Sequence, residues 1–330
     1  EYNIPICKTF KCGNLYANCS ERSLLLKNSS GRFGFIVPIS ISCSKRMKPI
    51  QDLLFNIGIH ISNWSWRPSR LFDGSAGANL SISIFITNNS RENFSATYRR
   101  WNTDARKYIF QNIEFVTLEN LNINGIVPKI GKCLELNIYQ KICYLDRISK
   151  HLSNLASAEH HIYYKRTGGL YWKIFTDFRP KLWLDGVQTY STKEAVINAI
   201  NEDDKFIAIA HLWSDLYWWW YQIHSDVRNN NPSDVLALPI IKSAFDDTQL
   251  VILSKNLMID LSNNAVWSER KFRGSVSRYK SFIPKLSKPI IDEIDKVLAK
   301  HYGFTEEELD LIINYDIKYR MGGELNNEEE

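Results

Sequence analysis

Long runs of apolar residues are missing from this sequence. Its 330 residues are 44% hydrophobic, yet no stretch approaches the roughly 20 apolar residues that a membrane-spanning helix needs. The start of the chain also lacks the basic segment followed by an apolar one that marks a secretory signal peptide. We therefore expect a cytoplasmic protein with no membrane partner.

The six cysteines lack the spacing of a metal site. No two of them form a Cys-x-x-Cys pair, and no histidine follows them at zinc-ligand spacing. His160 and His161 are neighbours without a supporting set of ligands. The sequence therefore predicts no metal site, and it predicts reduced, mostly buried thiols at Cys7, Cys12, Cys19, Cys43, Cys133 and Cys143.

Familiar catalytic motifs are also missing. No glycine-rich phosphate loop follows a strand, no serine or cysteine occupies a nucleophile elbow, and no pair of carboxylates stands out by its spacing. The net charge is only +5, which permits an anionic partner but does not demand one. The residues alone name no reaction.

The patterning that is present predicts an α/β protein. In the first part of the chain, expected helices and strands alternate as in half of a doubly wound sheet. The first strand reads as one buried on both faces of a parallel sheet, because it is almost entirely apolar. Helices are expected at 15–26 and 49–55, strands at 33–38, 57–61 and 80–86, a basic loop at 39–48, and connecting structure at 90–137.

Helical spacing dominates the second part of the chain. Ser191 and Glu194 have the spacing of a capping box, as have Thr305 and Glu308. The tryptophans 218–220 suit either core packing or ligand stacking. Helices are expected at 141–158, 191–200, 212–223, 250–261, 289–302 and 305–319, and a strand at 206–210.

Aromatic, basic and turn residues are densest at 162–178. Two β-prone runs, 162–164 and 170–175, flank a Gly-Gly pair that supplies the positive φ angles of a tight hairpin turn. Such a hairpin could stack bases on its aromatic rings and bind phosphates through its cations. The alternative is an ordinary hairpin with buried aromatic residues. The residues concerned are Tyr163, Tyr164, Lys165, Arg166, Thr167, Gly168, Gly169, Tyr171, Trp172 and Lys173.

Several stretches resemble one family, in the order in which that family has them. They are Asn14-Leu15-Tyr16-Ala17, Glu21-Arg22-Ser23-Leu24, residues 31–38, Arg67-Pro68-Ser69-Arg70-Leu71-Phe72, residues 164–172 and residues 309–320. They look like the gamma-class DNA adenine-N6 methyltransferases of type II restriction-modification systems with a TaqI-like target-recognition domain. The Arg67–Phe72 stretch resembles motif VIII of that class.

This resemblance implies an α/β fold with a fixed order of parts. Residues 1–97 would form the C-terminal half of a Rossmann-like methyltransferase sheet, with motifs V to VIII. Residues 98–158 would connect it to a mixed α/β target-recognition domain at 159–330. The implied partner is double-stranded DNA.

The family's mechanism assigns roles to individual residues. Such enzymes flip one adenine out of duplex DNA and methylate its N6 amino group from S-adenosylmethionine. Phe72 aligns with the aromatic residue that stacks on the flipped base, although a Phe packed in the core at a strand entrance is the alternative. DNA contacts are implied for Lys45, Arg46, Arg70, Lys165, Arg166, Thr167, Gly168, Gly169, Tyr171 and Trp172.

Two motifs of the family do not occur in this sequence. The aromatic-x-Gly-x-Gly loop that holds S-adenosylmethionine, and the Asn-Pro-Pro-Tyr motif that holds the adenine amino group, should both precede Glu1. Asn18-Cys19 also replaces the bulky residues usual after Asn-Leu-Tyr-Ala. We therefore expect no catalytic residue here, an inactive chain when alone, and a partner that supplies the missing N-terminal half.

Two other functions remain open from the sequence. One is a non-catalytic DNA-binding specificity subunit, which would use the recognition domain without chemistry. The other is an aromatic-rich carbohydrate- or protein-binding module, suggested by the tryptophans and the hairpin alone.

Overall fold

The computed structural model describes residues 7–69, 71–72, 80–119, 121, 125–153, 159–169 and 171–322. The chain divides into two compact units, Glu1–Cys143 with Gln222–Val227, and Tyr144–Tyr221 with Arg228–Glu330. Its architecture is mixed α/β, as expected. Within the described ranges, no helix has the length and apolar character to cross a membrane.

The boundary between the units differs from the expected one. Residues 98–143 pack with the first unit instead of forming a separate connection. The segment 222–227 also returns to the first unit, where the ammonium of buried Lys129 donates to the carbonyl oxygens of Ile223 at 3.0 Å and Ser225 at 2.8 Å. A buried ammonium needs such partners, because leaving it without them is costly.

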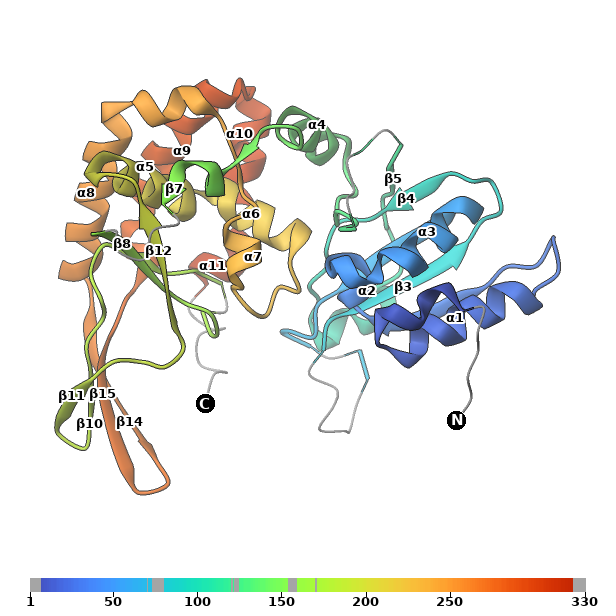
Figure 1. Ribbon diagram of the computed structural model, residues 1–330, viewed down its shortest axis with the longest axis horizontal. Coiled ribbons are helices and arrows are strands. Elements are labelled where there is room, and N and C mark those ends of the chain that lie inside the picture. The colour runs from blue at the N-terminus through green and yellow to red at the C-terminus, as the bar shows by residue number, and fades with distance from the viewer. Residues whose placement is uncertain are drawn as a thin grey trace. The chain divides into compact units, whose positions relative to one another are not determined.

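The first unit is built on a five-stranded sheet in the order β1-β3-β2-β4-β5. Strand β3 runs antiparallel to both β1 and β2, so β1 and β2 run in the same direction. Helices α2 and α3 lie in the connection between them (Figure 1). The elements are η1 (Lys8–Cys12), α1 (Leu15–Leu26), β1 (Gly34–Pro38), α2 (Ser40–Cys43), η2 (Lys45–Met47), α3 (Lys48–Ile57), β2 (Ile59–Trp64), β3 (Ile82–Thr87), β4 (Asn93–Ser95), η3 (Thr103–Tyr108), β5 (Val116–Thr117) and α4 (Cys133–Ile142).

Two expectations about this unit were wrong. Strand β1 is not buried between parallel neighbours, because it ends the described sheet, pairs antiparallel with β3 and exposes Gly34 and Ile36. The expected loop at 39–48 forms α2 and η2, whose Ile41 and Met47 are buried in the core. The other expected helices and strands of this unit are confirmed to within a few residues.

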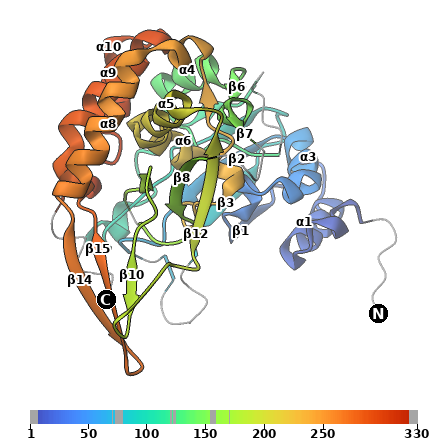
Figure 2. The same cartoon turned by 60° about the vertical axis from the view of Figure 1, so that its left-hand side comes forward.

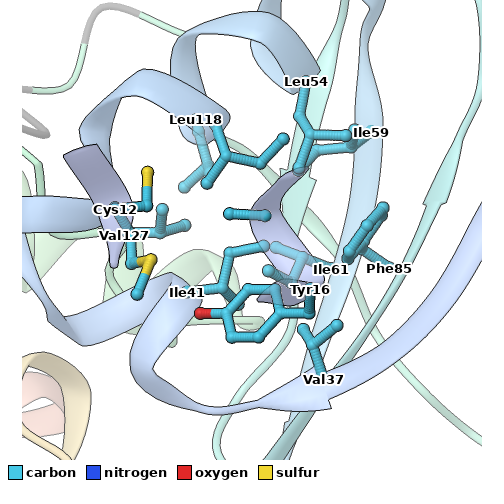
Figure 3. Close-up of a cluster of buried hydrophobic side chains, with 13 residues drawn as sticks. Cys12, Tyr16, Val37, Ile41, Leu54, Ile59, Ile61, Phe85, Leu118 and Val127 are labelled. Carbon is cyan, nitrogen blue, oxygen red and sulfur yellow. The ribbon is translucent and has the colours of Figure 1, made fainter. Parts of the chain in front are cut away.

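The core of the first unit lies between the sheet and its helices. Tyr16, Ile41 and Phe85 come from α1, α2 and β3 and belong to one cluster of buried side chains (Figure 3). Helix α1 buries Tyr16, Ala17, Ser20 and Glu21, while its leucines 15, 25 and 26 are exposed. The apolar spacing therefore located the helix but not its buried face.

Glu21 ties η1 to α1. Its carboxylate accepts hydrogen bonds from the backbone N–H groups of Lys8 at 3.0 Å and Thr9 at 2.9 Å, and from the Thr9 hydroxyl at 2.7 Å. Burial raises the pKa of Glu21, but these bonds and one from the Cys7 thiol outweigh burial and lower the pKa to about 2. The carboxylate is therefore ionised when it holds η1.

The second unit combines small antiparallel sheets with a helical layer. One sheet has the order β7-β12-β8-β9 and another the order β11-β10-β15-β14. The elements are β6 (Asp146–Arg147), η4 (Ile148–His151), β7 (Leu152–Ser153), β8 (His160–Lys165), β9 (Phe175–Thr176), β10 (Leu182–Leu184), β11 (Val187–Thr189), β12 (Glu194–Ala199), α5 (Glu202–Trp213), α6 (Asp215–His224), α7 (Pro232–Val235), β13 (Pro239–Ile240), η5 (Lys242–Asp246), α8 (Thr248–Asn263), β14 (Val266–Phe272), β15 (Ser275–Ser281), η6 (Pro284–Ser287), α9 (Lys288–Tyr302), α10 (Glu306–Asn314) and α11 (Ile317–Met321). The last residues of α6 belong to the first unit.

Three expected elements of this unit were wrong. In place of the helix expected at 141–158, α4 ends at Ile142 and is followed by β6 and β7, which pair with the distant strands β13 and β12, while residues 154–158 lie outside the described residues. The expected helix at 191–200 is strand β12, which is paired on both sides. The expected strand at 206–210 lies inside helix α5, which starts at an Asn201 cap. Long-range pairing overrode the local signal in the first two cases.

The remaining helices follow their sequence signals. Helices α8 and α9 lie where their apolar spacing placed them, and α9 ends at Gly303 with φ of +65°. Thr305 and Glu308 form the expected capping box of α10, which ends at Asn314. Trp218, Trp219 and Trp220 are at most 3% exposed, so core packing is confirmed for them. The acidic end at 328–330 lies outside the described residues.

None of the six cysteines, all of them described residues, forms a disulfide. Only Cys12 and Cys143 are buried, however, while Cys19 and Cys133 are exposed. The expectation of mostly buried thiols was therefore wrong. His160 and His161 bond to Glu202 and Asn198, respectively.

Candidate nucleic-acid interface

The predicted hairpin is present, but its turn is wider than the sequence suggested. Strand β8 pairs antiparallel with β9, with Tyr163 opposite Thr176 and Tyr164 opposite Phe175. The connection spans residues 166–174. Within it, Gly168 and Gly169 have the expected positive φ angles of +81° and +66°. A Cβ atom on Gly169 would lie 2.4 Å from the Trp172 carbonyl oxygen, so the loop turns back on itself there.

The first half of this loop faces solvent. Lys165, Arg166, Thr167, Gly168 and Gly169 are all exposed. The backbone of Arg166 is held on both sides, since its N–H donates to the Lys193 carbonyl at 3.0 Å and its own carbonyl accepts from the Asn230 N–H at 2.8 Å. The loop therefore presents two cationic side chains from a fixed backbone.

The second half of the loop is structural, which corrects part of the prediction. Tyr171 is 3% exposed and stacks on Tyr319, with ring centroids 5.8 Å apart and planes 12° apart. Lys173 is 6% exposed and donates to the Gly168 carbonyl at 3.2 Å. Trp172 is half-buried and donates its indole N–H to the Arg320 carbonyl at 3.1 Å. Because Tyr171 is packed in this way, its ring offers no free face to a base.

A cleft opens beside the exposed half of the loop. It has a volume of about 550 Å³ and lies between the β7-β12-β8-β9 sheet and the β11-β10-β15-β14 sheet. Lys165, Lys181, Arg270 and Lys280 line it, together with the rings of Tyr163, Tyr164 and Tyr279. The Lys165 ammonium lies 5.8 Å from the centroid of the Tyr279 ring.

The charge of this cleft is positive among its described lining residues. Its carboxylate, Glu194, accepts a hydrogen bond from Arg179 at 2.9 Å, which offsets its charge. Tyr164 is neutral at neutral pH, as a tyrosine ordinarily is, and burial raises its pKa further, to about 12. Uncompensated cations beside aromatic rings suit a phosphate backbone with exposed bases.

Sequence reasoning did not assign Lys181, Arg270 and Lys280 to this site. The available signal was the interleaving of basic and aromatic residues at 270–273 and 278–280. Lys280 lies on β15, which pairs with β10, and it lines the same cleft as Lys165 of β8. That pairing has no local sequence signature.

The remaining predicted residues belong to the first unit. Phe72 is 53% exposed, which argues against the alternative of a core residue. Its neighbour Leu71 packs against the buried Trp64 and Trp101, and the Leu71 carbonyl accepts a hydrogen bond from Arg106 at 3.1 Å. Lys45 and Arg46 are exposed on η2, and Arg70 lies outside the described residues.

No protein-family model matches this chain, and no curated protein sequence matches it.

Proposed function

We propose that this chain is the C-terminal part of a site-specific DNA adenine-N6 methyltransferase and that its second unit binds duplex DNA. The observation that carries the proposal is the cationic cleft beside the exposed Lys165–Gly169 loop. Lys165, Lys181, Arg270 and Lys280 reach this cleft from different strands or their ends. Such a convergence favours a polyanionic partner.

The sheet of the first unit supports the same proposal. Strands β1 and β2 run in the same direction on either side of the antiparallel β3 and are connected through α2 and α3, which is the parallel crossover that a Rossmann-like sheet contains. In this proposal β1 to β3 are the closing strands of a Rossmann-like sheet, and Phe72 stacks on the flipped adenine.

The residues that border the family's methyl-donor pocket do not fit a complete cofactor site. Asn14 caps α1 by accepting from the Tyr16 N–H at 3.4 Å, and the Tyr16 hydroxyl pairs with Ser40 at 3.0 Å. Tyr16 and Ala17 are buried. The side chains of Asn14, Tyr16 and Ala17 therefore stabilise the helix and the core. We assign no part of S-adenosylmethionine binding to them and no methyl-transfer step to this chain.

A binding experiment tests the DNA-binding part of the proposal. The chain is titrated with a pool of random-sequence duplexes over a range of salt concentrations. Replacing both loop cations, Lys165→Ala with Arg166→Ala, should lower the slope of log K against log salt by about 2, since each phosphate contact contributes about 0.9. The matched control, Lys242→Ala with Lys300→Ala, removes two exposed cations elsewhere in the unit and should leave the slope unchanged.

The outcome also separates the competing functions. No duplex binding by the unmodified chain, or binding that salt does not weaken, would refute the proposal and favour a carbohydrate- or protein-binding module. A second experiment adds a methyltransferase N-terminal half that carries the Asn-Pro-Pro-Tyr motif and measures transfer of labelled methyl groups to adenine. Duplex binding without any methylation in that mixture would favour a non-catalytic specificity subunit.

A further inference from the structure

Strands β14 and β15 form a regular two-stranded ribbon. They pair antiparallel from Val266 opposite Ser281 to Phe272 opposite Ser275. Arg273 and Gly274 form the turn, with φ angles of +49° and +87°. Positive φ at both central residues is the type I′ geometry, which matches the twist of a hairpin. The turn is therefore a well-defined tip.

The ribbon is largely open to solvent. In Figures 1 and 2 its tip extends away from the helices of its own unit. Trp267 is 47% exposed and Phe272 at the tip is 62% exposed. Apart from Ser268, every residue of β14 is exposed. Large exposed apolar side chains on a ribbon are typical of a surface that a binding partner covers.

The charge of the ribbon identifies the chemistry of that partner. Residues 266–281 carry five cations, Arg270, Lys271, Arg273, Arg278 and Lys280, against one carboxylate, Glu269. Side chains alternate between the two faces of a strand. The register places Lys271 and Lys280 on one face and Arg270 on the other, and both Arg270 and Lys280 reach the cleft described above. Cations therefore project from both faces.

One face also carries a packed aromatic and cationic group. The Trp183 and Trp267 rings contact each other edge to face, with centroids 5.2 Å apart. The Arg278 guanidinium lies 4.5 Å from the Trp267 centroid. This group stiffens the base of the ribbon, so that the tip can be presented without a large loss of conformational entropy on binding.

We propose that the β14–β15 ribbon enters the major groove of duplex DNA and that Arg273 at its tip contacts base edges there. The major groove, about 12 Å wide, admits a two-stranded β-ribbon, and phosphates line both of its walls. Cations on both faces of the ribbon match those two walls. An arginine at the tip is suited to the O6 and N7 acceptors of guanine. This inference rests on the proposed DNA binding, and it assigns base reading to the ribbon and phosphate contacts to the Lys165–Gly169 loop.

The first test separates base contacts from phosphate contacts. A preferred duplex is selected from a random-sequence pool and compared with a scrambled one. Arg273→Asn keeps the turn, because asparagine tolerates positive φ and Asn-Gly favours type I′. It should weaken binding to the preferred duplex by roughly 5- to 100-fold, with a much smaller effect on the scrambled duplex. Lys271→Gln, which changes a ribbon cation that does not line the cleft, should instead weaken both duplexes alike and lower the salt slope by about 1.

The second test locates the groove. Guanine N7 lies in the major groove, so methylation of N7 should block binding of the unmodified chain at particular guanines. Arg273→Asn should abolish at least one of these interference positions. The control Lys242→Ala with Lys300→Ala should keep all of them, and near-ultraviolet circular dichroism should show the Trp183–Trp267 contact intact in each variant.

Failure of this inference can be distinguished from failure of the proposed function. If the unmodified chain binds duplex DNA and the Lys165→Ala, Arg166→Ala variant weakens it, DNA binding stands. Ribbon variants that then keep the affinity, salt slope and interference pattern of the unmodified chain would overturn the ribbon assignment alone. If the unmodified chain binds no duplex, both fail together.

Discussion

Arg320 and Trp172 are joined by two contacts although 148 positions separate them. The Arg320 guanidinium carbon lies 3.9 Å from the Trp172 ring centroid, and the Trp172 indole N–H donates to the Arg320 carbonyl at 3.1 Å. Next to this pair, Tyr319 stacks on Tyr171. Helix α11 therefore holds the loop whose exposed half carries the candidate DNA-binding cations.

A buried ion-pair network fixes Arg320 in turn. Its guanidinium bonds to the carboxylate of Asp215, which is fully buried and also pairs with Lys288 at 3.0 Å. Burial and the neighbouring Asp215 raise the pKa of Asp295 well above its usual value, while its carboxyl oxygens accept from the Asp215 N–H at 3.0 Å. A cation could be held by the carboxylates of Asp215, Asp292 and Asp295, which lie close together. In this protein, Lys288 and Arg320 supply the positive charge beside them.

Replacing Arg320 should release the loop. Arg320→Ala leaves a buried carboxylate with one cation fewer and removes the guanidinium contact with the Trp172 ring, while the hydrogen bond to the residue 320 carbonyl can remain. Breaking one side of a buried ion pair costs about 3–5 kcal/mol. We expect faster tryptic cleavage after Lys165 and Arg166 under native conditions, together with weaker duplex binding.

Lys318→Ala provides the matched control for this prediction. Lys318 lies on the same helix but is exposed, with its ammonium 4.7 Å from the Tyr319 ring centroid. Its removal should leave the cleavage rate unchanged. Equal cleavage rates for Arg320→Ala and the unmodified chain would show that α11 does not hold the loop.

Acid should destabilise the second unit through His211. This residue is 0% exposed in α5, its Nδ1 lies 2.9 Å from the Ile207 carbonyl oxygen, and its ring stacks near Phe245. Burial lowers its pKa to about 4 against the opposing effect of the hydrogen bond to Ile207, and the neighbouring His301 and His151 act in the same direction as burial. An unfolded histidine has a pKa of about 6.5, so the unfolded state binds the proton first as pH falls.

The sign and size of the effect follow from these pKa values. The contribution of His211 to the free energy of unfolding is fully present above about pH 6.5 and declines as pH drops towards 4. The total loss is about 3 kcal/mol, at 1.36 kcal/mol for each pKa unit. His211→Leu should flatten this dependence in urea unfolding, whatever its effect at neutral pH. His160→Gln, which changes a partly exposed histidine paired with Glu202, should keep it. An unchanged pH slope in His211→Leu would assign the acid lability to other groups.

Local signals account for the parts of the fold that were predicted correctly. Helix α10 starts at a capping box, and α9 has proline in its first turn and Gly303 at its end. Both signals act within a few residues. Ser191 and Glu194 have the same capping-box spacing, but the Glu194 backbone pairs with Lys165 and its side chain bonds to Arg179. Those partners lie too far along the chain to be read from the local pattern.

The candidate site also contains residues that local signals could predict and residues that they could not. The Gly168-Gly169 turn and its exposed cations could be predicted, because glycine at positive φ is a local requirement. The burial of Tyr171 could not, since it depends on Tyr319 from α11. The basic cleft also depends on the register of β10 with β15.

Gly58, between α3 and β2, should tolerate no side chain without a shift of its neighbours. It follows α3 with φ of +95°, its N–H donates to the Leu54 carbonyl at 3.0 Å, and its carbonyl accepts from the Asn88 N–H at 2.9 Å. A Cβ atom there would lie 2.2 Å from the Asn88 side-chain oxygen and 2.6 Å from the Arg91 nitrogen. The turn that leads into β2 would have to open to make room.

We expect Gly58→Ala to destabilise the first unit by about 2–4 kcal/mol, because backbone strain and a steric clash act together. Gly13→Ala is the matched control, since Gly13 has φ of +61° but no atom within 4 Å of the added Cβ. That variant carries only the left-handed backbone cost of about 1–2 kcal/mol. Hydrogen–deuterium exchange of peptides from β2 and β3 measures both variants in the same unit. Equal protection from exchange in Gly58→Ala and Gly13→Ala would mean that the turn at Gly58 relaxes without cost and that the clash does not constrain the sheet.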